Sequence, residues 1–142
     1  MNFDIEFAYK IQQCYTKRCK EICKEVNLPQ TAFDILMFLS NNPKYKSARD
    51  IVEVRKLKAN LVSINVDRLV KEGYLERKCV AGDRRKIELH VTDNAKRIVD
   101  VGHVVQQQFV LDLFSGLTQM EMEAMQESFS KIDRNLDRIM EE

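Results

Sequence analysis

The chain has 142 residues and a net charge of +1, which is the size of a single domain that can bury a substantial core without disulfides or structural metals. Its N-terminus mixes charges with apolar residues and no apolar run is long enough to span a bilayer. We therefore expect a cytoplasmic protein without a signal peptide or a membrane partner. Four glycines and two prolines, with frequent Lys, Glu, Leu, Ile and Met, favour a mainly helical fold.

The positive charge is concentrated in the middle of the chain. Residues 44–97 contain fifteen Lys and Arg and eight Asp and Glu, a net charge of +7, whereas the remainder contains eight and fourteen, a net charge of −6. Such a basic segment between neutral or acidic ends is expected when one part of a protein contacts a polyanion.

Two helices are predicted before the basic segment. The first covers residues 4–26, where apolar residues recur at steps of three and four, and it ends before Pro29. The second covers residues 30–40 and is apolar around most of its circumference, so we expect it to be the most buried helix. The sequence Asn-Asn-Pro at residues 41–43 then breaks the chain.

Two shorter helices follow. Ser47 is the predicted N-cap of a helix that ends near Val54, with Asp50 at the third position of a capping box. The next helix covers residues 59–72 and stops at Gly73, where a left-handed cap is common. The residues predicted to face inward are Ile51, Val52 and Val54 in the shorter helix and Val62, Val66, Leu69 and Val70 in the longer one.

A β-hairpin is predicted directly after these helices. Its strands cover residues 74–80 and 86–91, and the loop between them, AGDRR, contains a glycine for the turn. In the second strand, alternation places Ile87, Leu89 and Val91 on one face. Two adjacent arginines at a hairpin tip repel each other and bury little, so a phosphate-rich partner explains them better than packing does. Two short helices followed by a hairpin indicate a winged helix-turn-helix.

The C-terminal part is predicted to form two further helices. Thr92 is the expected cap of a long helix that ends near Phe114, and Thr118 with Glu121 forms a capping box for the last helix. The long helix has two apolar stripes and the last one has a heptad-like seam, so these helices and the first one are expected to form a homodimer. The stripes contain Ile98, Gly102, Val105, Phe109 and Leu113 on one side and Val101, Val104 and Leu111 on the other; the seam contains Met122, Met125, Phe129, Ile132, Leu136 and Ile139.

No pattern in the sequence indicates a metal site, a cofactor or an enzyme. The four cysteines form no C-x-x-C pair and have no histidine at zinc-ligand spacing, so we expect buried or half-buried thiols in a reducing compartment. The two histidines, His90 and His103, have no nucleophile or paired carboxylate at a spacing that suggests catalysis.

Three segments carry a more specific signal. They are VDRLVKEGYLERK at residues 66–78, GDRR in the hairpin loop and IELHVT at residues 87–92. In these segments and in the order of its predicted elements, the chain resembles the MarR family of bacterial and archaeal transcriptional regulators over nearly its whole length. The resemblance implies a single, mainly α domain with a small β-hairpin wing. Residues 30–92 would form the winged helix-turn-helix DNA-binding region, and residues 1–27 and 93–142 a helical dimerisation region.

The resemblance also implies how the second helix of the helix-turn-helix contacts DNA. Asn60, Ser63 and Ile64 lie toward its N-terminal half, where base edges are usually reached. Asn can pair with adenine and Ile64 can contact a thymine methyl group. Lys58 and Arg68 are expected to contact phosphates.

A second set of DNA contacts is implied in the wing. Arg85 matches the arginine that such wings insert into the minor groove. Arg84 and Lys86 would add phosphate contacts, and Asp83 would brace the loop by pairing with an arginine.

These observations predict a dimeric repressor that binds a pseudo-palindromic operator in duplex DNA and is released by a small-molecule effector. The effector cavity is expected where the first and fifth helices meet the winged region. Its predicted lining residues are Phe7, Ile11, Phe33 and Met37.

Two alternatives stay open at the level of the sequence. One is a thiol-based redox sensor on the same scaffold, with Cys14, Cys19 or Cys23 as the reactive site. The other is a winged-helix module that docks a protein; it would show a flat salt response, whereas binding of DNA by several basic residues weakens steeply as salt rises.

Overall fold

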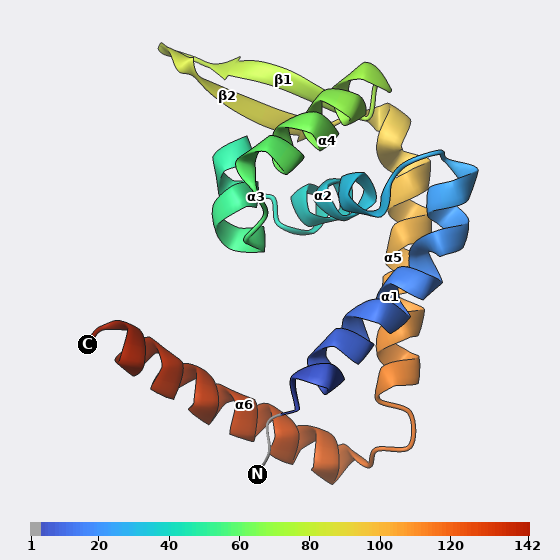
Figure 1. Cartoon of the computed structure of the whole chain (residues 1–142), viewed down its shortest axis with the longest axis vertical. Helices are drawn as coiled ribbons and strands as arrows, with labels where there is room; N and C mark the ends of the chain where they lie inside the picture. The colour runs from blue at the N-terminus through green and yellow to red at the C-terminus, as the bar shows by residue number, and fades with distance from the viewer. Residues whose placement is uncertain (1–3) are drawn as a thin grey trace. The chain divides into compact units, whose positions relative to one another are not determined.

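The structure, a computed structural model, describes residues 4–142 and is mainly helical, with a two-stranded antiparallel hairpin (Figure 1). This confirms the predicted class of a mainly α fold with a β-hairpin wing. In the described part of the chain, no helix is both long enough and apolar enough to cross a membrane. The elements are α1 (Ile5–Glu25), α2 (Gln30–Asn41), α3 (Ala48–Arg55), α4 (Ala59–Lys71), β1 (Leu75–Val80), β2 (Asp83–Val91), the 3-10 turn η1 (Asp93–Ala95), α5 (Lys96–Leu113) and α6 (Gln119–Met140).

The chain divides into two compact units, Met1–Phe109 and Val110–Glu142. The first contains α1 to α4, the hairpin and most of α5, and the second contains the end of α5 and all of α6. Residues 1–3, with which the predicted dimerisation region begins, lie outside the described residues.

Helix α2 forms the centre of the core of the first unit. Seven of its twelve residues are buried, and Phe33 and Leu36 are completely inaccessible to solvent. The helix contacts α1, α4 and β2 (Figure 1), and buried apolar residues of all three elements belong to the same core cluster. The prediction that this helix is the most buried one is confirmed, because its apolar residues extend around most of its circumference.

Three helices begin at a side-chain cap, and two of these caps, at α3 and α6, are the predicted ones. The Asp4 carboxylate accepts a backbone amide from the first turn of α1 at 2.9 Å. Ser47 and Asp50 form a reciprocal capping box at the start of α3, and Thr118 and Glu121 form another at the start of α6. These side chains satisfy amides that have no partner within the helix, which fixes where each helix starts.

The predicted cap at Thr92 is wrong. Thr92 leads into η1, and α5 begins only at Lys96. The Thr92 hydroxyl donates instead to the carbonyl oxygen of Gly73 at 2.5 Å. Gly73 has a φ of 81°, a left-handed value that glycine adopts without strain, and it follows the end of α4 as predicted. The hydroxyl therefore ties the end of the hairpin to the end of α4.

The turn of the hairpin is shorter than the predicted five-residue loop. Only residues 81–82 form the turn, and β2 begins at Asp83, so that Arg84 and Arg85 lie in a strand. A shift in register between Cys79 and Val80 accommodates the extra length. The prediction failed because Asp83 already pairs with Val80, and the polar residues between Asp83 and Ile87 are accommodated in the strand as a bulge.

Two residues that were predicted to face inward are exposed. Val54 is 43% exposed and Ile87 is 47% exposed, whereas Ile51 and Leu89 nearby are 0% and 5% exposed. Val54 lies in the last turn of the short α3, and Ile87 lies in the half of the hairpin nearer the turn. At both places the apolar pattern continues beyond the core.

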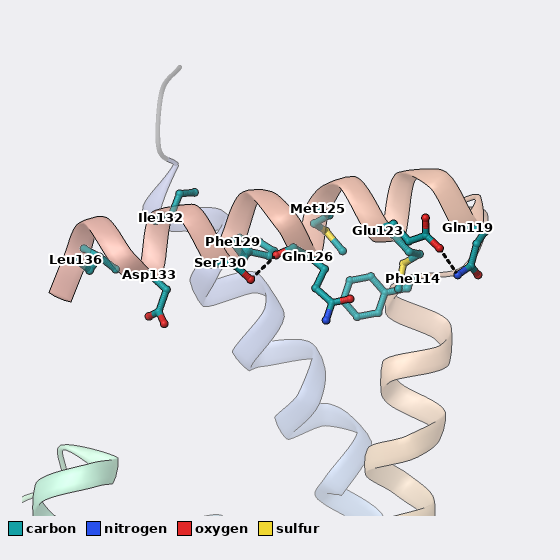
Figure 2. Close-up of a pocket in the computed structure, with 11 residues that line it drawn as sticks. Phe114, Gln119, Glu123, Met125, Gln126, Phe129, Ser130, Ile132, Asp133 and Leu136 are labelled. Atoms are coloured by element: carbon teal, nitrogen blue, oxygen red, sulfur yellow. Dashed lines mark hydrogen bonds between the residues drawn. The ribbon is translucent and has the colours of Figure 1, made fainter. Parts of the chain in front are cut away.

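Four residues of the apolar seam of α6 are exposed to solvent, whereas Met122 and Met125 are half-buried. Phe129, Ile132, Leu136 and Ile139 are each between 42% and 59% exposed. Phe114, which follows α5, lines the same groove as the α6 side chains in the second unit (Figure 2). The helix has no buried residue, so its seam remains available to a partner.

Candidate nucleic-acid interface

Helices α3 and α4 form the helix-turn-helix of the first unit (Figure 1). The turn between them begins at Lys56, which has a left-handed φ of 55° and ends α3. Lys58 then occupies the N-cap position of α4. Because α4 packs on α2, α3 and β1, one side of it is fixed in the core and the opposite side faces outward.

The outward side of α4 carries the residues predicted to contact base edges. Asn60, Ser63 and Ile64 are all exposed, and Ile64 is 65% exposed although it is apolar. Lys58 is also exposed at the start of the helix. The structure thus brings these four side chains onto the exposed surface of one short segment.

The inward side of α4 contains a polar residue that the sequence prediction missed. Asn65 is only 5% exposed, and its side-chain nitrogen donates to the Leu61 carbonyl at 2.8 Å. It lies among the buried residues Val62, Val66 and Leu69. Asn65 is three residues from Val62 and four residues from Leu69, and this spacing could have predicted that its side chain faces the core.

Arg68, predicted to contact a phosphate, makes a contact within the chain. Its Nη2 donates to the backbone carbonyl of Asn27, in the corner between α1 and α2, at 2.6 Å, and its Nε is buried without a hydrogen-bond partner among the described residues. Asn27 has a left-handed φ of 54°, which turns its carbonyl out of α1. Arg68 therefore connects the exposed helix of the helix-turn-helix to the N-terminal helices.

The predicted wing residues lie on β2. Arg84, Arg85 and Lys86 are all exposed, and they lie between Asp83 and Ile87, the two residues that pair with β1 on either side of the register shift. Asp83 accepts a hydrogen bond from the backbone amide of Arg85 at 2.9 Å. Asp83 was predicted to brace the loop by pairing with an arginine, and in the structure it is bonded to the backbone of Arg85.

Polar side-chain contacts order the surface around the hairpin. The Arg77 guanidinium contacts the Asp67 carboxylate, which joins β1 to α4. His90 Nε2 lies 2.9 Å from Glu88 Oε2 on the same side of β2. Both pairs are partly exposed, so they orient side chains more than they stabilise the fold.

The comparisons with known proteins agree with this geometry. Residues 26–86 match the sequence model of the MarR family. Over 124 residues the chain is 32% identical to YfiV of Bacillus subtilis (strain 168), an uncharacterized HTH-type transcriptional regulator, and the match covers 83% of this chain and 72% of YfiV. The chain belongs to the MarR family of transcriptional regulators.

A second relative and a solved structure extend the MarR likeness to nearly the whole chain. YpoP of Bacillus subtilis, another uncharacterized HTH-type transcriptional regulator, is 24% identical over 140 residues, which cover 94% of this chain and 99% of YpoP. The crystal structure of a Listeria monocytogenes regulator assigned to the MarR family, complexed with 26mer DNA, superimposes with a TM-score of 0.81 at 17% identity. It covers 96% of this chain and 90% of the other.

The first unit of this MarR chain contains a cavity of about 510 Å³, but it is not lined by the predicted set of residues. Ile11 lines it, whereas Phe7 is 63% exposed on α1 and Phe33 is fully buried in the core. Met37 is buried and lines a separate cavity of about 120 Å³. The principal polar and aromatic lining residues of the 510 Å³ cavity are Tyr15, Gln30, Asp34, Arg55 and Phe109.

A chain of hydrogen bonds connects three helices beside this cavity. Gln106 of α5 donates from Nε2 to the Tyr15 hydroxyl of α1 at 2.9 Å and accepts from Asn41 of α2 at 3.1 Å. His103 Nε2 lies 2.7 Å from the Asn41 oxygen. Burial raises the pKa of the Tyr15 hydroxyl far above its usual value, so this group stays protonated.

The cysteines in the MarR scaffold fall into two classes. Cys19 and Cys23 are buried, and burial raises the pKa of both thiols, that of Cys23 to about 11. Cys23 donates to the side-chain oxygen of Gln30 at 3.7 Å. A buried, protonated thiol is a poor nucleophile, which argues against a redox role for this pair. Cys14 and Cys79 are exposed.

Within residues 4–142, no group of three His, Cys, Asp or Glu side chains is arranged to hold a metal ion. The two histidines take part in the contacts with Glu88 and Asn41 described above.

Proposed function

We propose that the protein is a homodimeric transcriptional repressor that binds a pseudo-palindromic operator in duplex DNA and dissociates from it when a small-molecule effector binds. The observation that carries the proposal is the surface formed by α4 and β2 in one compact unit. It combines an exposed helix face with three consecutive basic residues on the adjacent hairpin. A helix face of this kind fits the major groove and a basic strand fits the phosphate backbone.

The α4 residues are proposed to read the DNA sequence. Asn60 can form a bidentate pair with adenine, Ser63 can donate or accept, and Ile64 can contact a thymine methyl group. Lys58 at the N-terminus of the helix contacts a phosphate. For Arg68, the bond to the Asn27 carbonyl favours a positioning role over the phosphate contact expected from its sequence position.

The wing residues are proposed to bind the adjacent minor groove and backbone. Arg85 enters the minor groove, while Arg84 and Lys86 contact phosphates. The bond from the Arg85 amide to Asp83 holds the backbone at the point from which the guanidinium extends. This local bond is the proposed bracing role of Asp83.

The proposed dimer is formed by residues 1–27 and 93–142, with residues 30–92 as the DNA-binding region. The exposed seam of α6 supports it, since Phe129, Ile132 and Leu136 present an apolar surface at a heptad-like spacing (Figure 2). Phe129→Glu should therefore shift the protein toward monomer in analytical ultracentrifugation. Glu127→Lys, which changes charge on the same helix outside the seam, is the control.

Selection of bound sequences from random duplex DNA tests the proposal. We expect a palindrome whose half-sites lie about one helical turn, roughly 10 base pairs, apart. Absence of any enriched sequence would contradict sequence-specific binding.

The wing is tested by salt dependence on the selected duplex. Arg84→Ala and Lys86→Ala should each reduce the slope of log affinity against log salt by about 2, because each substitution removes one phosphate contact from each protomer of the proposed dimer. Lys96→Ala removes the same charge from an exposed position on α5 and should leave the slope unchanged. A flat salt response in the wild-type protein would favour a protein-docking module instead.

A further inference from the structure

The 510 Å³ cavity of the first unit has an unequal distribution of charge. Among the described lining residues, Asp34 of α2 is its acidic group and Arg55 at the end of α3 is its basic group. Asp34 is partly buried whereas Arg55 is exposed. Because a charge acts more strongly where water is excluded, the field inside the cavity is dominated by the Asp34 carboxylate.

The Asp34 carboxylate has spare capacity to bind a ligand. It accepts one hydrogen bond, from Gln30 Nε2 at 2.8 Å, and an ionised carboxylate offers about four acceptor positions. Burial raises the pKa of Asp34, and the Gln30 bond and the positive charge of Arg55 counteract this only in part. An ionised carboxylate in this position is therefore incompletely compensated by the protein.

The other residues that line the cavity fit an apolar or aromatic part of a ligand. Ile11 and Leu57 supply aliphatic surface, and the rings of Tyr15 and Phe109 meet edge to face with their centroids 5.4 Å apart. Aromatic rings also attract cations through their electron-rich faces. A volume of about 510 Å³ lies in the range of small-molecule sites.

From these contacts we infer that the cavity binds an organic cation, an amine or amidine attached to an aromatic or aliphatic body, with Asp34 as its counter-ion. An organic anion would be repelled by the partly buried carboxylate and would have only the solvent-exposed Arg55 as a partner. The regulatory part of the inference, release of DNA on binding, rests on the proposed function.

The cavity is in direct contact with the turn that places α4. Arg55 and Leu57 line it on either side of Lys56, whose left-handed backbone forms the turn, and Lys58 is already the N-cap of α4. A ligand that displaces either side chain therefore shifts the start of the DNA-reading helix. Such a ligand favours the conformation in which α4 does not fit the operator.

Binding is tested with three probes of the same shape: benzamidine, which is cationic, benzamide, which is neutral, and benzoate, which is anionic. Isothermal titration of the full chain without DNA should show saturable binding of benzamidine, with benzamide at least about tenfold weaker because it lacks the charge-assisted bond. Benzoate binding as tightly as benzamidine, or no saturable binding of benzamidine, would overturn the inference.

Variants then locate the site. Asp34→Asn keeps the size of the side chain and should weaken benzamidine binding about tenfold or more. Glu53→Gln removes a carboxylate from the exposed side of α3 and should leave binding unchanged. Unaltered affinity in Asp34→Asn would refute the site. If this variant does not fold, the comparison of benzamidine with benzamide on the wild-type chain still decides the charge requirement.

A separate measurement distinguishes failure of the site from failure of the proposed function. Benzamidine is titrated into the complex of the wild-type chain with its selected duplex, and fluorescence anisotropy reports release. Release from the wild-type protein but not from Asp34→Asn supports the coupling, and saturable binding without release refutes it. If the chain binds benzamidine but no DNA, the proposed function fails while the cation site stands.

Discussion

Gly102→Ala tests how tightly α5 packs on α2. A Cβ atom at this position would lie 2.5 Å from the Met37 sulfur, 2.8 Å from its terminal methyl carbon and 3.2 Å from Phe33 Cζ. Ordinary contacts between such atoms are about 3.5–4 Å, so the Met37 side chain must move by roughly 1 Å. Met37 is 1% exposed, which leaves it little free space.

The magnitude follows from two opposing effects. Overpacking of a core costs about 1–3 kcal/mol, whereas Ala is favoured over Gly within a helix by about 1 kcal/mol. We therefore expect Gly102→Ala to lower the free energy of unfolding by about 1 kcal/mol. Met37→Val removes the two closest atoms, and in that background the same substitution should stabilise the protein by up to about 1 kcal/mol.

Urea unfolding followed by circular dichroism measures all four proteins of this cycle. The protomer concentration must be the same throughout, because association would change the apparent stability. The expected coupling free energy between the two positions is about 2 kcal/mol. Equal stabilisation by Gly102→Ala in both backgrounds would show that the close approach of α5 to Met37 is not a constraint, and the reasoning would be refuted.

Three further predictions concern the DNA-reading helix, the cavity and the cysteines. Replacing the thymine proposed to contact Ile64 by uracil should weaken operator binding of the wild-type protein about threefold to fivefold, since one methyl group is worth about 0.8 kcal/mol. The same replacement should not affect binding by Ile64→Ala. Anisotropy titrations at fixed salt measure both affinities, and equal losses in the two proteins would exclude the contact. Burial raises the pKa of Asp34, so its contribution to stability is present below the pKa of the unfolded state and lost as pH rises through the folded pKa. Asp34→Asn should therefore gain stability relative to wild type at pH 7 and lose that advantage near pH 3, as thermal unfolding will show; a pH-independent difference would contradict the assignment. Iodoacetamide should label the exposed Cys14 and Cys79 in the native protein, and the buried Cys19 and Cys23 only after unfolding. Mass spectrometry of peptides measures the labelling at each cysteine. Rapid labelling of the buried pair in the native protein would contradict this prediction.

The helices and their starts could be predicted because the signals are local. The capping residues Ser47 and Thr118 lie within three residues of the groups that they bond, and the apolar pattern of α2 lies within a single helix. The turn of the hairpin could not be predicted in the same way. Arg84 and Arg85 are typical of loops by side chain, but they continue the strand between Asp83 and Ile87, which pair with Val80 and Cys79 of β1.

The site was harder to predict where its contacts join distant parts of the chain. Arg68 and Asn27 are 41 residues apart, and nothing near either residue in the sequence indicates their bond. In the cavity, Phe33 was predicted to line the wall because apolar residues line cavities and cores alike. The signal that could have been used was Asp34, an acidic residue within the otherwise apolar run TAFDILMFL. A charge in such a place needs a reason other than packing.

The two sides of α4 differ in how well they tolerate amino-acid substitutions. Val62 and Val66 are buried at 0% and 2%, whereas Ser63 and Ile64 between them are exposed. Substitutions at exposed positions of this kind usually alter stability by no more than about 0.5 kcal/mol. If the outer side of α4 reads the operator, as proposed above, a duplicated copy of this gene could acquire a different operator through a few changes there. The buried side would keep the fold intact during that divergence, so regulators can multiply on this scaffold without passing through unstable intermediates.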